Sequence, residues 1–209
     1  MGALEILRVP PANRAVEVYF DYSSPFAYLG TTQIERVAAQ AGARVEWRPL
    51  LLGALFKAIG TPMVPLHAMP EPKRRYQEVE LVRWAAHWRV PYAFNTHFPL
   101  RTVDALRLTL LAPEEARAAL VHRVMRAAWA EDRDVGDRDV LARCAADVGL
   151  DAALLDRVGE AKQALIAATD EAIAAGCPGA PCFVVRRGEQ SELFWGQDRL
   201  SFVAAALTR

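Results

Sequence analysis

The segment that decides the fold reads Val16-Glu17-Val18-Tyr19-Phe20-Asp21-Tyr22-Ser23-Ser24-Pro25-Phe26-Ala27-Tyr28-Leu29. Its first five residues are mostly β-branched or aromatic, which predicts a short strand. Proline is favoured at the first position of a helix and serine directly before it, so Pro25 indicates a helix start. Apolar residues then recur at helical spacing as far as Gly42. The segment therefore predicts a strand followed directly by a helix.

Further strand and helix patterns lie on either side of the chain's middle. Residues 44–50 read as a second strand, so the opening is a strand–helix–strand unit with the usual right-handed crossover. Near the other end, residues 182–185 and 192–195 read as strands on either side of a polar Arg-Gly-Glu-Gln turn. Such an arrangement predicts an antiparallel hairpin. The apolar positions of residues 200–207 predict a closing helix.

The middle of the chain has helical periodicity throughout. A proline-rich loop leads into a helix that carries Trp84 and Trp88 and ends before Pro91. Helical patterns follow around residues 103–110, 116–127 and 140–148, and the strongest one covers residues 154–172, with Gly176 as its stop. The prediction is an α/β protein with a thioredoxin-like fold and a large all-helical insertion. Residues 16–52 and 176–209 form the thioredoxin-like domain, and residues 53–175 form the insertion.

Composition excludes several classes of function. Twenty-five basic residues balance 25 acidic ones, so no net field favours nucleic acid or an anionic membrane. No apolar stretch is long enough to span a membrane, and the first 14 residues lack a secretory pattern, so we expect a cytoplasmic protein. The three cysteines and four histidines show no metal-site spacing. We therefore expect reduced thiols and no metal.

Three junctions carry candidate chemistry: residues 20–29, residues 179–183 (Gly-Ala-Pro-Cys-Phe) and residues 194–199 (Phe-Trp-Gly-Gln-Asp-Arg). Together they resemble the 2-hydroxychromene-2-carboxylate isomerases, which are related to kappa-class glutathione transferases within the DsbA-like thioredoxin superfamily. The resemblance extends over nearly the whole chain from Val16 and includes residues 48–53 and 83–85.

The first junction departs from the redox members of that superfamily. Those proteins carry Cys-Pro-x-Cys where this chain has Ser24-Pro25-Phe26-Ala27, so it has no dithiol to exchange here. The resemblance implies that Ser24 holds the sulfur of bound glutathione and lowers its pKa, with Pro25 and Phe26 beside it. The other interpretation of Ser24 is a plain helix cap. Ser23 is expected to be a plain cap or a neighbour of the site.

The other two junctions are assigned by the same resemblance. Pro181 is expected in the cis form, so that the backbone of Ala180 can pair with the cysteinyl part of glutathione. Gln197 and Asp198 are expected at the γ-glutamyl end, with Asp198 facing its ammonium group. Asp198 as an N-cap of the last helix stays open as an alternative.

Two positions depart from the kappa-type pattern, which usually has asparagine where this chain has Thr61 and Arg101. Thr61 retains a hydrogen-bonding group at the cofactor. Arg101 either binds a substrate carboxylate or is a solvent-facing loop residue. The resemblance implies a glutathione-dependent isomerase acting on an aromatic 2-oxo acid. A kappa-like transferase and a non-catalytic thioredoxin-fold binding protein are the alternatives, and a homodimer is left open.

Overall fold

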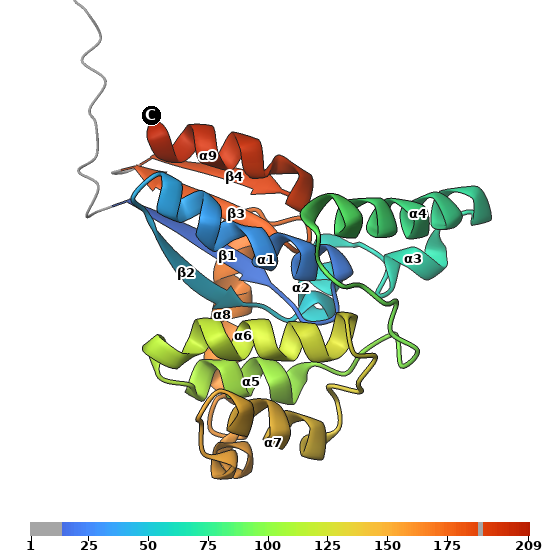
Figure 1. Cartoon of the computed structure of the whole chain (residues 1–209), viewed down its shortest axis with the longest axis vertical. Helices are drawn as coiled ribbons and strands as arrows, with labels where there is room; N and C mark the ends of the chain where they lie inside the picture. Colours follow the sequence, from blue (N-terminus) through green and yellow to red (C-terminus); the bar gives the residue numbers. More distant parts are fainter. Residues whose placement is uncertain (1–13, 188–189) are drawn as a thin grey trace, which may run out of the picture.

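The computed structural model describes residues 14–187 and 190–209 (Figure 1). The elements follow one another as β1 (Ala15–Phe20), α1 (Pro25–Gln40), β2 (Arg44–Pro49), α2 (Leu52–Ile59), α3 (Pro65–Ala68), α4 (Glu71–Trp88), α5 (Val103–Leu111), α6 (Glu114–Trp129), α7 (Arg138–Asp147), the 3₁₀ helix η2 (Ala152–Arg157), α8 (Lys162–Ala174), β3 (Cys182–Arg187), β4 (Gln190–Trp195), the 3₁₀ helix η3 (Gln197–Arg199) and α9 (Leu200–Thr208).

The four strands form one mixed sheet in the order β2-β1-β3-β4. β1 and β2 are parallel and joined by α1, and β3 runs antiparallel to both β1 and β4. The predicted strand–helix–strand unit and the predicted hairpin are therefore confirmed. The tip of the hairpin turn, residues 188–189, lies outside the described residues.

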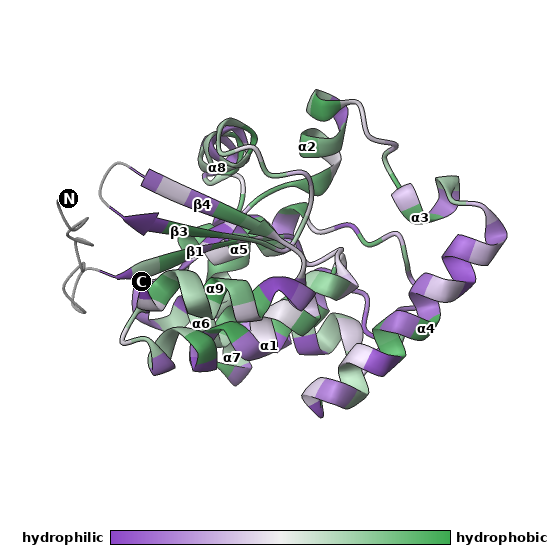
Figure 2. Cartoon of the chain, turned by 90° about the horizontal axis from the view of Figure 1, so that it is seen from above, coloured by the Kyte–Doolittle hydropathy of each residue, from purple (hydrophilic) through white to green (hydrophobic). Residues whose placement is uncertain are grey.

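Helices cover both faces of the sheet, as Figures 1 and 2 show from two directions. α1 and α9 pack against each other and against the strands on one face, whereas α8 contacts β2 from the other side. Residues that alternate along β1, such as Val16, Val18 and Phe20, are completely buried. The central strand thus has the apolar pattern of a sheet that is covered by helices.

The helical region between β2 and β3 lies mainly beside one edge of the sheet, and α4 projects away from it (Figure 1). This arrangement confirms a thioredoxin-like fold with a large helical insertion. The domain limits themselves stay a prediction; α8 belongs to the predicted insertion but packs on β2. Within the described residues no helix is both long and apolar enough to cross a membrane.

Two sequence expectations were wrong in detail. Residues 154–172 do not form one helix: Asp151 caps the 3₁₀ helix η2, a turn follows, and α8 begins only at Lys162. Gly159, in the turn, favours the break because glycine is a poor helix former. Helix α2 was missed, because Gly53 looked like a turn residue. It lies instead in the first turn of α2, and a Cβ there would be 3.0 Å from the sulfur of Met63.

Candidate active site

Ser24 connects the start of α1 to the loop before β3. Its Oγ accepts a hydrogen bond from the backbone N–H of Ala27 at 3.1 Å, so Ser24 is the N-cap of α1, and Pro25 follows at the first helical position. The same hydroxyl donates to the backbone oxygen of Ala180 at 2.8 Å. Ser23 was expected to be a plain cap or a neighbour, and it is a neighbour: its backbone N–H donates to Asp21, because an Asx turn ends β1.

The loop before β3 has the predicted geometry. The Ala180–Pro181 peptide bond is cis, as the resemblance of this segment to the cis-proline loop of thioredoxin folds implied. The carbonyl of Pro181 accepts from the backbone N–H of Gly196 at 3.0 Å, which ties the loop to the end of β4. A Cβ at position 179 would come within 2.9 Å of Nε1 of Trp195, so a larger residue there would have to displace that ring. We call residues 177–182 the cis-proline loop.

A buried carboxylate supports the β1–α1 junction from below. Asp21 is almost fully buried, and it accepts hydrogen bonds from the backbone of Ser23 at 2.9 Å and of Leu52 at 2.8 Å. The hydroxyl of Thr102 donates to it as well, at 2.7 Å. Burial raises the pKa of Asp21, and the hydrogen bonds oppose that shift. The contacts fix the starts of α1, α2 and α5 relative to one another.

The charge environment of this junction suits an anion. The dipole of α1 places partial positive charge at its N-terminus, and its first turn contains no acidic residue. Phe26 is half-buried and packs against the core behind the junction. Ser24, Pro25, Ala180 and Pro181 are therefore brought together, as the sequence predicted.

Gln197 is buried, whereas Asp198 is exposed to solvent. Gln197 is 2% exposed, and its side-chain oxygen accepts from Nε1 of Trp88 at 2.7 Å, so it joins the end of α4 to the sheet. Asp198 is exposed and forms an ion pair with Arg199 at 3.4 Å. It makes no capping hydrogen bond, since α9 begins after Arg199 without a side-chain cap. The capping alternative for Asp198 was therefore wrong, and its carboxylate lies exposed beside Arg199.

Arg101 lies on the segment that leads to Thr102, whereas Thr61 lies at the opposite end of α2 from Leu52, which contacts Asp21. Thr61 follows the C-terminus of α2, where its backbone N–H donates to the carbonyl of Phe56 at 2.9 Å. Arg101 is exposed and directly precedes Thr102, the residue that binds Asp21. Among the described residues, no hydrogen bond or ion pair joins either side chain to Ser24 or to the cis-proline loop.

An aromatic cluster next to the junction was missed by the sequence analysis. Trp129 is completely buried and donates from Nε1 to the backbone oxygen of Tyr22 at 2.8 Å. The rings of Tyr92, Phe94 and Phe98 pack around it, and the Phe98–Pro99 peptide bond is also cis. Burial raises the pKa of Tyr92, whose hydroxyl has no partner in the described part of the chain. The only sequence signal was the density of aromatic and proline residues between 91 and 99.

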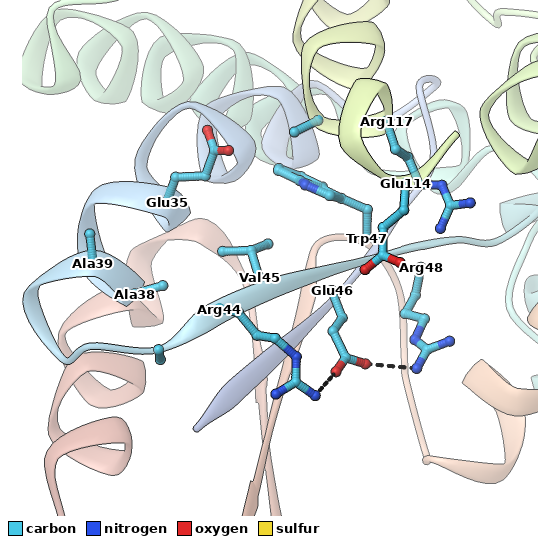
Figure 3. A pocket seen from close by; sticks show the side chains of 12 residues that line it. Glu35, Ala38, Ala39, Arg44, Val45, Glu46, Trp47, Arg48, Glu114 and Arg117 are labelled. Atoms are coloured by element: carbon cyan, nitrogen blue, oxygen red, sulfur yellow. Dashed lines mark hydrogen bonds and ion pairs between the residues drawn. The ribbon is translucent and has the colours of Figure 1, made fainter. Parts of the chain in front are cut away.

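A separate hollow of about 590 Å³ lies along β2, between α1 and the start of α6 (Figure 3). Figure 3 shows Glu46 between Arg44 and Arg48, with which it forms ion pairs, the latter at 2.8 Å. None of the predicted site residues lines this hollow. Its charged groups pair along an exposed sheet edge, which is typical of an edge strand protected against unwanted pairing.

The described residues contain no cluster of three or more histidine, cysteine or acidic side chains that could hold a metal ion. All three cysteines are free thiols and buried. Cys182 is the one closest to the site along the chain, but its thiol donates to the carbonyl of Gly179 at 3.0 Å and is fully enclosed.

Comparisons with known proteins agree with the thioredoxin-like fold. The model of the DsbA-like thioredoxin domain family matches residues 15–208. A 2-hydroxychromene-2-carboxylate isomerase of Sphingobium xenophagum is 32% identical over 93% of this chain and 98% of its own. Glutathione S-transferase kappa 1 of Rattus norvegicus is 26% identical over 94% and 92%.

A solved structure of 2-hydroxychromene-2-carboxylate isomerase is also similar. It has a TM-score of 0.77 and 25% sequence identity, and the match covers 92% of this chain and 94% of that one. The chain belongs to the DsbA-like thioredoxin family and, within it, to the family of the 2-hydroxychromene-2-carboxylate isomerases.

Proposed function

We propose that the protein is a glutathione-dependent isomerase that interconverts 2-hydroxychromene-2-carboxylate and trans-o-hydroxybenzylidenepyruvate. The observation that carries the proposal is the position of the Ser24 hydroxyl, which lies at the N-terminus of α1 and 2.8 Å from the backbone oxygen of Ala180. A cytoplasmic location, where glutathione is plentiful and cysteines stay reduced, is part of the same proposal.

The residues present fit glutathione by their chemistry. The helix N-terminus suits the negative sulfur, and the cis peptide at Pro181 presents the main chain of Ala180 for strand-like pairing with a peptide. The carboxylate of Asp198, which caps no helix, suits the γ-glutamyl ammonium. The amide of Gln197, held by Trp88, and the hydroxyl of Thr61 complete the proposed binding groups.

Opening of the cyclic hemiketal gives a 2-oxo acid with an electron-poor double bond; glutathione, when bound, would supply a thiolate that adds to this bond, allows it to rotate and then leaves. Ser24 donates its hydroxyl proton as a hydrogen bond to the sulfur and keeps it negative at neutral pH. To do so, Ser24 turns that proton away from Ala180. Arg101 binds the substrate carboxylate and favours the negative charge that develops on the adjacent oxo group. The reaction has no net redox change.

A kappa-like glutathione transferase is the second candidate, favoured by the match to kappa-class relatives. An assay with limiting glutathione separates the two. An isomerase converts many equivalents of the chromene carboxylate and leaves the free thiol undiminished, whereas a transferase consumes one thiol for each product. A protein that binds no glutathione in a calorimetric titration would be neither, and would favour the non-catalytic binding protein.

Asp198→Ala is expected to weaken glutathione binding by about 1.5–3 kcal/mol, the range for a hydrogen bond to a charged group. Calorimetry with glutathione measures the change. Glu160→Ala is the matched control, because it removes another exposed carboxylate that pairs with a nearby arginine, Arg157. Equal affinity in the Asp198 variant and in the control would remove Asp198 from the binding site.

The variant with Cys144, Cys177 and Cys182 all changed to alanine is expected to keep its isomerase activity, because all three thiols are enclosed and the proposed chemistry uses the thiol of glutathione. Steady-state turnover, measured beside a thermal melt, tests this. A folded triple variant without turnover would show that a protein thiol takes part in catalysis.

A further inference from the structure

A second hollow, of about 580 Å³, lies where helices α2, α5 and α8 meet. We call it the α8 groove. Its wall is mostly apolar and includes Ala54 and Ala58 of α2, Val103 of α5, and Leu165, Ile166 and Ile173 of α8. None of the residues proposed to bind glutathione or the substrate lines it. The α8 groove is therefore a place in the molecule that the proposed function does not use.

The α8 groove is elongated. Its lining residues on α8 run from Lys162 to Ile173 at the spacing of one helix face, so that face forms a continuous wall. At 1.5 Å per residue the wall is about 16 Å long. Ile166, near its middle, is 45% exposed, so apolar surface along the groove is in contact with water. An extended alkyl chain matches a wall of this length better than a compact ring does.

The charged residues of the α8 groove favour an anion. Lys57 of α2, Arg107 of α5 and Lys162 of α8 line it, and Asp170 is the one acidic residue in its lining. The whole chain has as many basic as acidic residues, so this excess of positive charge is local. Within the described part of the chain, none of the three cations forms a hydrogen bond or an ion pair with a protein acceptor.

Arg107 is the strongest candidate to anchor that anion. It is half-buried, and its Nε is enclosed without a hydrogen-bond partner among the residues that the structure describes. Buried donors nearly always have a partner, so an unpaired one is typical of a place that a water or a ligand completes. The hydroxyl of Thr169, also in the lining, is already used: it donates to the carbonyl of Leu165 at 2.7 Å and accepts from the backbone of Leu51 at 3.1 Å.

We propose that the α8 groove binds a carboxylate with an extended alkyl tail, that is, a fatty acid. Arg107 pairs with the carboxylate, because a guanidinium matches its two oxygens, and the neighbouring lysines add positive charge. The tail lies along Leu165, Ile166 and Ile173. Burial of the tail supplies most of the affinity, whereas the charge selects an anion. This inference does not rest on the proposed function.

Calorimetry with dodecanoate, below the concentration at which it forms micelles, tests the proposal. We expect saturable binding of one molecule per chain, with an affinity that rises about 2- to 4-fold per methylene from octanoate to dodecanoate. Dodecyltrimethylammonium has the same tail and the opposite charge, and it should bind at least about 10-fold more weakly. Absence of saturable dodecanoate binding would overturn the proposal, and so would equal affinity for the ammonium compound.

Arg107→Met keeps an unbranched side chain and removes the charge, and it is expected to weaken dodecanoate binding about 10-fold. Arg143→Met is the matched control, because Arg143 is an exposed arginine on α7 that does not line the groove. Should Arg107→Met fail to fold, Ala58→Trp, at an exposed position, fills the groove and should also weaken binding. Equal affinity in the control and in a folded groove variant would contradict the proposed site.

Methyl NMR spectra of the isoleucines locate the ligand. Dodecanoate should shift the signals of Ile166 and Ile173, which line the groove, and not that of Ile34, which is completely buried on α1. Signals of both groove isoleucines that stay in place on saturation would show that the ligand binds elsewhere.

Competition with S-methylglutathione keeps this inference apart from the proposed function. Saturation with that compound should leave the affinity for dodecanoate unchanged, because the two sites share no residue. Competition between the two ligands would place dodecanoate at the Ser24 junction and overturn the α8 groove as its site. If the protein binds no glutathione derivative, the proposed function fails, and dodecanoate is still expected to bind.

Discussion

Replacing Ser24 with alanine is expected to lower isomerase turnover at neutral pH about 10- to 100-fold. The variant loses a hydrogen bond to a charged sulfur, which is worth about 1.5–3 kcal/mol. Stability should fall by only about 0.5–2 kcal/mol, the usual cost of a lost helix cap. Because the defect lies in thiol ionisation, raising the pH should recover part of the rate. Steady-state assays between neutral and alkaline pH measure both effects.

Two variants of the same junction serve as controls for this prediction. Ser23→Ala leaves the backbone contact of residue 23 with Asp21 intact and should retain the original turnover. Ser24→Thr keeps a hydroxyl and a favourable cap, so it should recover most of what alanine loses. A Ser24→Ala enzyme with unchanged turnover and an unchanged pH profile would restrict Ser24 to its capping role.

Replacing Trp129 with alanine is expected to lower the free energy of unfolding by about 3–5 kcal/mol. Trp129 is completely buried, its ring lies 5.8 Å from that of Phe94, and its Nε1 donates to Tyr22 at 2.8 Å. The substitution leaves a cavity directly behind the β1–α1 junction and an unsatisfied backbone oxygen. Denaturant unfolding of the purified variant measures the loss.

Phe202→Ala is the control, because Phe202 lies on α9 and is 55% exposed. It should cost no more than about 0.5 kcal/mol. Trp129→Phe separates the contribution of ring packing from that of the hydrogen bond. It keeps most of the ring but loses the hydrogen bond to Tyr22, so the free energy of unfolding should fall by about 1–3 kcal/mol. Equal stability of Trp129→Ala and Phe202→Ala would contradict the packing described for this cluster.

The parts of the fold that follow from local sequence were predictable. The strand at residues 16–20, the helix after Pro25 and the hairpin around residues 182–195 depend on patterns of neighbouring residues. Helix α2 was missed because Gly53 looked like a turn residue, although a helix tolerates a glycine at a cost of about 1 kcal/mol. The break between η2 and α8 was missed because apolar spacing continues across Gly159, although the backbone changes direction.

The site was predictable only where the family pattern assigns a role. The cis form of Pro181 was predicted, but that of Pro99 was not, because no local pattern separates a cis from a trans proline in a loop. The bond between Trp88 and Gln197 joins residues that are 109 positions apart. Periodicity contains no information on such a contact, so the burial of Gln197 could not be foreseen.

Ser24 combines two roles that the sequence analysis treated as alternatives. The hydroxyl oxygen accepts from Ala27 while the hydroxyl hydrogen donates to Ala180. Capping uses the oxygen's lone pair and leaves the donor available for another acceptor. The structural role of Ser24 is therefore compatible with donation to a bound thiolate, provided that the hydrogen turns from Ala180 to the sulfur.

The most direct test of the account is the ultraviolet absorbance of enzyme-bound glutathione thiolate, followed against pH in the original protein and in Ser24→Ala. We expect the original protein to hold the thiolate at neutral pH, with a pKa below that of free glutathione because of Ser24 and the N-terminus of α1. The variant's curve should shift to higher pH. Superimposed titration curves for two proteins that bind glutathione equally would contradict the claim that Ser24 activates the thiol.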